Sequence, residues 1–328
     1  MHKFLVIQTA FIGDVVLATA LLEKLHSFYP EAKLDILVRN GNEALFTNHP
    51  YINQVLIWHK KEKKYQYLLQ LLQQIRLKNY DVVINVQRFA ATGFLTAFSS
   101  AKLTIGFNKN PFSFLFTKKI KHHFGNAIHE VQRNHLLIAS LTDDVVCNPK
   151  LYPSKADYAS VAAYKQQPYI VIAPTSVWFT KQFPANKWVD FINQLPLSYP
   201  IYLIGAPTDA QACNAIVEAT TRTNITNLAG QLSFLQSAAL QQDAVMNYVN
   251  DSAPMHFASA VNAPTTAIYC STLPSFGYGP LSDNAFIVEV QEKLPCRPCG
   301  IHGKKACPLG HFNCANMITN EQLLGRLE

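Results

Sequence analysis

Residues 250–260 read NDSAPMHFASA and directly follow a run over 243–249 that is typical of a buried strand. Pro254 is tolerated only in the first turn of a helix, so the pattern predicts a helix over 254–261. Asp251 and Ser252 precede it and are favourable N-cap residues. A helix that starts at the end of a parallel strand is a phosphate site, whereas an ordinary capped helix is the alternative interpretation.

The N-terminus repeats this strand, loop and helix arrangement. Residues 4–8 form a short apolar strand, residues 9–13 a tight loop, and Asp14 opens an amphipathic helix that reaches Leu25. The loop has only Gly13 where the dinucleotide fingerprint needs three glycines, so nicotinamide or flavin chemistry is disfavoured.

Strand and helix patterns alternate along the whole chain, as expected for an α/β fold with doubly wound parallel sheets. The alternation is interrupted by a polar stretch over 142–167, which we interpret as a linker between two domains. No run of 18 apolar residues predicts a transmembrane helix, and no secretory signal precedes the first strand, so we expect a cytoplasmic protein.

Three motifs together resemble glycosyltransferase family nine, the ADP-heptose:lipopolysaccharide heptosyltransferases. They lie at 7–17 (IQTAFIGDVVL), 174–184 (PTSVWFTKQFP) and 250–256 (NDSAPMH). The resemblance implies two Rossmann-like domains facing across a cleft, the GT-B architecture. Residues 1–155 would form the acceptor-binding domain, and residues 156–328 the nucleotide-sugar-binding domain with a cysteine-rich tail.

The implied function is an inverting glycosyltransferase that moves a heptose, or a related sugar, from an ADP-sugar to a lipid-linked lipopolysaccharide core at the inner face of the cell membrane. The family usually has Arg where Gln182 stands and Gly where Ala253 stands. The missing cation leaves open a family-nine enzyme with another nucleotide-sugar and another glycan acceptor. A catalytically silent nucleotide-sugar or glycan-binding protein is a further alternative, as is a zinc-knuckle nucleic-acid binder.

Such a transfer needs a base for the acceptor proton and positive charge for the departing diphosphate. Asp14 is the predicted base, although it could serve only as a helix N-cap. Lys181 is the predicted charge acceptor, helped by Thr175 and Ser176, and a surface lysine is its alternative role. Fixed dipoles and one ammonium group can replace a divalent metal, so no cofactor is expected for catalysis.

The remaining donor contacts follow from the resemblance and from the helix start after residue 250. Asp251 would accept hydrogen bonds from sugar hydroxyls, and the amides and hydroxyl nearby would bind phosphate. The predicted donor-binding residues beyond Thr175, Ser176 and Lys181 are Asp209 for the ribose, Leu232 for the adenine, and Asp251, Ser252, Ala253 and His256 at the helix start. His256 could equally be a core histidine.

The chain has a net charge of +7 and a pI near 8.9. Its cations are clustered but fit no nucleic-acid reader motif, so we expect no nucleic-acid partner. Lys118, Lys119 and Lys121 follow an aromatic run over 112–116. A basic segment beside exposed aromatic residues suits an anionic membrane surface or a phosphorylated glycolipid, whereas a solvated face and a core strand are the alternative.

Four cysteines lie close together near the C-terminus, at Cys296, Cys299, Cys307 and Cys314. One C-x2-C pair is the usual first half of a zinc knuckle, but the second half lacks the two-residue gap. A structural zinc is therefore possible but not favoured over free thiols, and either way the cluster would serve to hold a loop in place.

Overall fold

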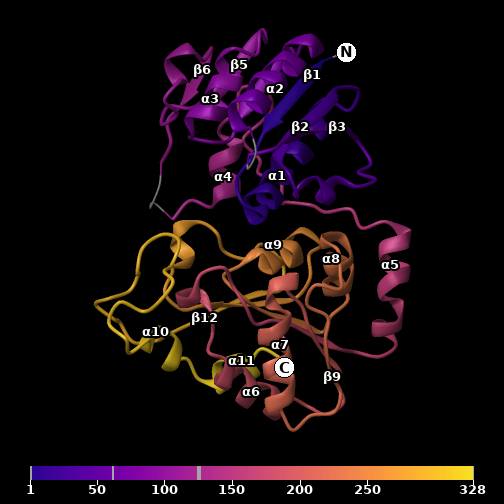
Figure 1. Ribbon diagram of the computed structural model, residues 1–328, viewed down its shortest axis with the longest axis vertical. Coiled ribbons are helices and arrows are strands. Elements are labelled where there is room, and N and C mark those ends of the chain that lie inside the picture. The colour runs from indigo at the N-terminus through magenta and orange to yellow at the C-terminus, as the bar shows by residue number, and fades with distance from the viewer. Residues whose placement is uncertain (1, 61–62, 124–126, 328) are drawn as a thin grey trace. The chain divides into compact units, whose positions relative to one another are not determined.

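A computed structural model describes residues 2–60, 63–123 and 127–327. The chain divides into two compact units, Met1–Tyr152 and Pro153–Glu328, which are coloured indigo to magenta and magenta to yellow in Figure 1. The division lies three residues before the boundary expected from the sequence. Within the described residues each unit contains one six-stranded parallel sheet, so the prediction of an α/β fold with two doubly wound sheets is confirmed.

The sheet of the first unit has the order β3-β2-β1-β4-β5-β6. Its apolar side chains alternate between two faces, because successive residues of a strand point to opposite sides. Leu5 and Ile7 pack with the apolar side chains of α2 and α3, and α1 and α4 contact each other. The elements are β1 (Lys3–Ile7), α1 (Ile12–Phe28), β2 (Lys33–Arg39), β3 (Ile52–Trp58), α2 (Lys64–Lys78), β4 (Val82–Asn85), α3 (Ala90–Ala97), β5 (Leu103–Phe107), β6 (Lys118–Ile120) and α4 (Glu130–His135).

The sheet of the second unit has the order β12-β11-β10-β7-β8-β9. One core cluster packs α6, α7 and α11 against it and another packs α5, α8 and α9, so helices cover both faces. The elements are α5 (Lys155–Val161), β7 (Ile170–Ala173), α6 (Ala185–Gln194), β8 (Ile201–Leu203), α7 (Ala210–Ala219), β9 (Ile225–Asn227), α8 (Phe234–Gln242), β10 (Met246–Asn250), α9 (Ala253–Ala260), β11 (Thr265–Tyr269), β12 (Ala285–Glu289), α10 (Asn313–Asn316) and α11 (Asn320–Leu324).

The expected linker over 142–167 is only partly irregular, because α5 lies within it. Ser154 and Asp157 form a capping box at its start: Ser154 Oγ accepts from Asp157 N at 3.2 Å, and Asp157 Oδ2 accepts from Ser154 N at 2.8 Å. Val161 at its end is fully buried against the sheet. The segment is polar overall, and it nevertheless forms a short helix that starts with a capping box and packs on the sheet through Val161.

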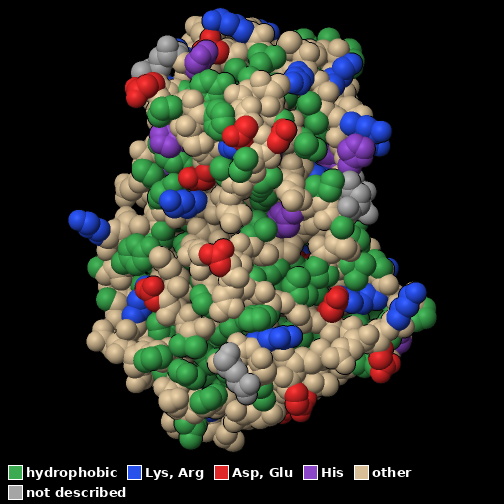
Figure 2. Space-filling model, turned by 180° about the vertical axis from the view of Figure 1, so that it is seen from behind, with side chains coloured by type: hydrophobic (Ala, Val, Ile, Leu, Met, Phe, Trp, Pro, Cys, Tyr) green, Lys and Arg blue, Asp and Glu red, His purple; other side chains and the backbone are tan. Residues whose placement is uncertain are grey.

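No helix in the described part of the chain is both long and apolar enough to cross a bilayer. On the face shown in Figure 2, the Lys and Arg side chains lie in separate small groups interspersed with Asp and Glu.

Candidate functional site

A group of hydrogen-bonded polar side chains lies where β10 ends and α9 begins. The helix starts at Ala253, as the Pro254 pattern predicts to within one residue, and Ser252 is its N-cap. The Ser252 side chain does not cap the helix, however; its Oγ donates to Asn250 O at 3.3 Å. Because no side chain caps this end, its backbone amides and the helix dipole are placed to receive an anion.

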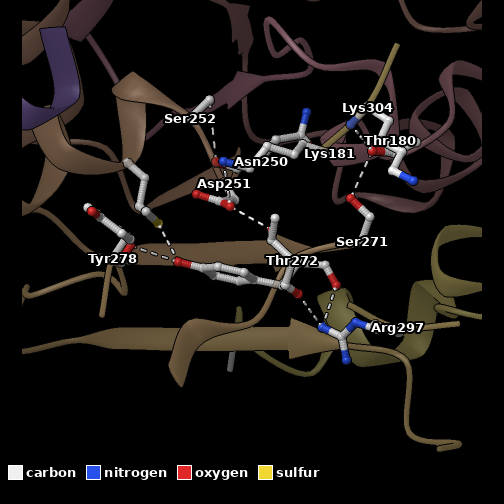
Figure 3. Close-up of polar contacts among 12 residues, drawn as sticks. Thr180, Lys181, Asn250, Asp251, Ser252, Ser271, Thr272, Tyr278, Arg297 and Lys304 are labelled. Carbon is white, nitrogen blue, oxygen red and sulfur yellow. Dashed lines mark hydrogen bonds and ion pairs between the residues drawn. The ribbon is translucent and has the colours of Figure 1, made fainter. Parts of the chain in front are cut away.

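Lys181 and Asp251 form an ion pair in this site (Figure 3). Lys181 Nζ lies 2.7 Å from Asp251 Oδ2, and the two side chains are 16% and 8% exposed. Thr272 Oγ1 donates to the same carboxylate oxygen at 2.6 Å. Asp251 therefore holds the ammonium group of Lys181 at the start of α9, in surroundings where charge is only weakly screened.

The loop after β7 lies beside this pair because β7 and β10 are neighbours in the sheet. Asn250 fastens the two chain segments: its Oδ1 accepts from Phe183 N at 2.9 Å and its Nδ2 donates to Thr175 O at 3.4 Å. Gln182 Nε2 donates to Ser176 O at 2.6 Å. Thr175, Ser176 and Lys181 are thus brought to the same sheet edge as Asp251, Ser252 and Ala253.

Asp209 and Leu232 lie on the loops that follow β8 and β9. Asp209 Oδ2 accepts from Ala206 N at 2.8 Å and so closes its own short turn. Leu232 is half-buried against the core cluster on the α8 side of the sheet. Gly230 N donates to Gly205 O at 2.9 Å, which holds these two loops together. His256, one turn into α9, is 6% exposed.

In the first unit, Asp14 lies in the first turn of α1. The helix begins at Ile12 with Phe11 as N-cap, so the expectation that Asp14 opens the helix was wrong by two residues. Burial, followed by the nearby Glu130 carboxylate, raises the Asp14 pKa to about 6, against the opposing effects of the Phe11 and Asp14 amides and of Arg39. A carboxylate with a pKa close to neutrality is suited to take a proton.

The loop that carries Asp14 is held by polar side chains that sequence reasoning missed. Lys60 Nζ donates to Thr9 O at 2.6 Å, Asn42 Nδ2 donates to Ala10 O at 3.1 Å, and Thr9 Oγ1 donates to Gln87 Oε1 at 2.6 Å. Lys60, Asn42 and Gln87 each lie just after a strand of one parallel sheet. Their positions directly after strands could have predicted that they lie near the Asp14 loop, because the carboxyl ends of parallel strands share one edge of the sheet.

The basic segment lies on the outermost strand of the same sheet, β6. Lys118 and Lys119 are on β6, an edge strand, and Lys119 and Lys121 are exposed. Phe114 and Leu115 are 72% and 45% exposed, whereas Phe116 is buried. Only part of the aromatic run is therefore core.

None of the four tail cysteines is paired in a disulfide in the structure. Cys314 is buried in the core cluster on the α6 side, and Cys296, Cys299 and Cys307 are half-buried. Burial, followed by the neighbouring Cys296 and Cys307, raises the pKa of the Cys299 thiol. Among the described residues, no group of three or more His, Cys, Asp or Glu side chains is arranged to hold a metal ion.

Two parallel sheets with polar side chains gathered at their carboxyl edges are the arrangement in which α/β proteins bind their ligands. The sequence profile of glycosyltransferase family 9 (heptosyltransferase) matches residues 68–308, so the chain belongs to this family and is a glycosyltransferase. The recognition made from the three motifs is confirmed.

Similar proteins span almost the whole chain. Lipopolysaccharide heptosyltransferase 3 of Escherichia coli is 28% identical over 84% of this chain and 85% of its own length. The structure of E. coli ADP-heptose lps heptosyltransferase II matches with a TM-score of 0.82 at 22% identity, over 99% of this chain and 97% of that one. E. coli heptosyltransferase WaaC with ADP-2-deoxy-2-fluoro heptose matches with a TM-score of 0.71 at 19% identity, over 98% of each chain.

Proposed function

We propose that this protein transfers a heptose from an ADP-sugar to a lipopolysaccharide core acceptor, with inversion at the anomeric carbon. The observation that carries the proposal is the Lys181–Asp251 pair at the open start of α9. The names of its heptosyltransferase relatives and the ADP-heptose analogue bound by one similar structure support the same donor and acceptor.

In the proposed mechanism Asp14 takes the proton of the acceptor hydroxyl, which then attacks the anomeric carbon as the bond to the diphosphate breaks. Lys181, the hydroxyl groups of Thr175 and Ser176, and the amides at the start of α9 stabilise the charge that develops on ADP. Asp251 Oδ2 already carries Lys181 and Thr272. We therefore assign its other oxygen, Oδ1, to the hydroxyl groups of the donor sugar.

A second candidate is a family member with a different donor. Gln182 stands where the resemblance implies an arginine, and its amide is engaged with Ser176 O, so it adds no positive charge to the phosphate site. Titration with ADP, UDP and GDP, followed by transfer assays with the matching sugars, decides between the two. We expect ADP to bind most tightly and ADP-heptose to be used; tighter binding of UDP or GDP would favour the second candidate.

We further propose that catalysis needs no metal and that the tail cysteines are thiols. The expected result is that elemental analysis of the purified protein finds no stoichiometric zinc or iron, and that transfer persists after treatment with a chelator. A four-thiolate site would instead hold about one metal ion per chain and release it to a chelator or to a thiol reagent. One ion per chain would overturn the thiol assignment, and loss of transfer on its removal would overturn the metal-free mechanism.

We also propose a cytoplasmic protein that lies peripherally at the inner face of the membrane, through the exposed Phe114 and Leu115 and the adjacent lysines. Replacing Lys118, Lys119 and Lys121 with Gln should reduce binding to anionic vesicles, because each lysine near such a surface contributes about 1 kcal/mol. The residual binding should depend less on salt.

A matched control makes the same change in charge in the other unit. Lys155, Lys293 and Lys305 are exposed lysines of the second unit. Their replacement with Gln should leave vesicle binding closer to the wild-type value. If both triple variants lose vesicle binding equally, the loss is due to net charge alone, and the proposal that the lysines of β6 bind the membrane is wrong.

A further inference from the structure

The cysteine-rich tail, residues 296–314, is hydrogen-bonded to the segment that carries Lys181. Thr180 N donates to Lys304 O at 3.1 Å, and Lys304 N donates to Thr180 Oγ1 at 2.8 Å. Gly303 has a φ of +78°, and a Cβ there would lie 3.0 Å from Lys181 Cγ. The tail therefore packs directly on the stem of Lys181, and a larger residue at 303 would displace it.

A second set of hydrogen bonds joins the tail to the end of β11. The Arg297 side chain, which is 9% exposed, donates from Nε to Cys270 O at 2.7 Å and from NH2 to Thr272 O at 2.8 Å. NH2 also lies 3.2 Å from Tyr269 O and 2.6 Å from Glu289 Oε2 on β12. One planar guanidinium group thus fixes three carbonyl groups of the chain segment that presents Thr272.

The two sets of hydrogen bonds are also connected through Thr180 and Ser271. Ser271 N and Oγ donate to Thr180 O at 3.2 Å and to Thr180 Oγ1 at 2.9 Å, while Cys299 N donates to Ser271 O at 3.0 Å. Thr180 and Ser271 are buried, so these contacts are shielded from water. The residues next along the chain are Lys181 and Thr272, and both contact Asp251.

We propose that Arg297 is a positioning residue for the donor site, acting through Thr272 and Asp251 on Lys181. This inference rests on the proposed function, because it assigns the Lys181 ammonium group to the departing diphosphate. Arg297 holds Thr272, Thr272 shares Asp251 Oδ2 with Lys181, and the ammonium group is thereby fixed where the charge develops. A lysine at 297 has no planar fork and cannot hold the same set of carbonyl groups.

The test is a double-mutant cycle between Arg297→Lys and Lys181→Ala, read in kcat and KM for transfer. In the wild-type background Arg297→Lys should lower kcat roughly 10–100-fold, the cost of a small misplacement of a catalytic group. In the Lys181→Ala background it should have little further effect, because the group that it positions is gone. Thr272→Val, which removes only the hydroxyl donor to Asp251, should show the same dependence and decides the matter if Arg297→Lys does not fold.

Arg222 provides a matched control within the same unit. Its guanidinium group is also buried and donates to the carbonyl groups of Leu195, Pro196 and Tyr199 at 2.6, 3.0 and 3.0 Å. Arg222→Lys should lower the melting temperature while leaving kcat of the folded enzyme near the wild-type value in both backgrounds.

Equal effects of Arg297→Lys with and without Lys181 would show a merely structural role and overturn the positioning proposal, while the proposed function would stand. If the wild type binds ADP but transfers no heptose, the proposed reaction fails, and the same cycle read in ADP affinity still tests the coupling. A wild type that does not bind ADP would overturn both.

Discussion

Replacing Asp14 with Asn is expected to lower the rate of heptose transfer by about 10²–10⁴-fold, the range for loss of a general base. The amide has nearly the same shape as the carboxylate but cannot accept the proton of the acceptor hydroxyl. ADP affinity should stay near the wild-type value, because the donor contacts that we propose all lie in the second unit. Single-turnover transfer and calorimetric titration with ADP measure the two effects separately, and a variant that transfers at the wild-type rate would end the assignment.

The pH dependence of the wild type provides an independent measurement of the same group. The Asp14 pKa is raised to about 6, and a base works only when it is ionised. kcat/KM should therefore be highest at pH values well above 6 and fall as the pH decreases through about 6. This acidic limb should be absent from the residual activity of Asp14→Asn.

Two neighbouring charges should move that limb in opposite directions. Glu130 raises the Asp14 pKa and Arg39 lowers it. Glu130→Gln should therefore shift the limb to lower pH, and Arg39→Gln should shift it to higher pH. Because Glu130 also pairs with the buried Arg133 at 2.6 Å, the melting temperature of this variant must be compared with the wild type. A limb that moves in neither variant would assign the titration to another group.

The two sheets could be predicted because their strands are short apolar runs with helical periodicity between them. The segment 243–260 illustrates this: the apolar run became the central strand β10, and Pro254 marked the start of α9 to within one residue. Local rules suffice here, since Pro is confined to the first turn of a helix. The start of α1 was less predictable, because Phe11 occupies the N-cap without a side-chain hydrogen bond.

Part of the candidate site could also be located from local sequence, since parallel strands place their following loops at one edge. Thr175 and Asp251 are 76 residues apart in sequence, and their strands are nevertheless neighbours in the sheet. The pattern could not predict which side chains at that edge form ion pairs with each other. Lys181 was expected to meet phosphate and Asp251 a sugar, and the structure shows that these two side chains also pair with each other.

The role of the tail was the least predictable feature. The spacing of Cys296 and Cys299 indicates a possible metal site, whereas the contacts with the donor site come from Arg297 and the backbone of Lys304. A buried arginine that binds main-chain carbonyl groups produces no periodic sequence pattern. The partners of Arg297 are carbonyl groups at the end of β11 and just after it. Such contacts depend on which loops the folded sheet brings together.

Lys181→Ala is expected to weaken both ADP binding and turnover, because the ammonium group meets the diphosphate in the ground state as well as in the transition state. Losing a hydrogen bond to a charged group costs about 1.5–3 kcal/mol, or roughly 10–150-fold in ADP affinity. The structure adds a second cost. The Asp251 side chain is buried, and without its cation it would present an uncompensated carboxylate to an anionic ligand.

The double variant Lys181→Ala/Asp251→Asn separates these two contributions. Removing the carboxylate should restore part of the ADP affinity but not the turnover, since no positive charge remains for the leaving group. Lys165→Ala is the matched control, because Lys165 forms a pair with Asp243 at the same distance of 2.7 Å in the same unit. It should leave ADP binding and turnover unchanged. Unchanged ADP affinity in Lys181→Ala itself would remove Lys181 from the donor site, and with it the reason for its pairing with Asp251 at the start of α9.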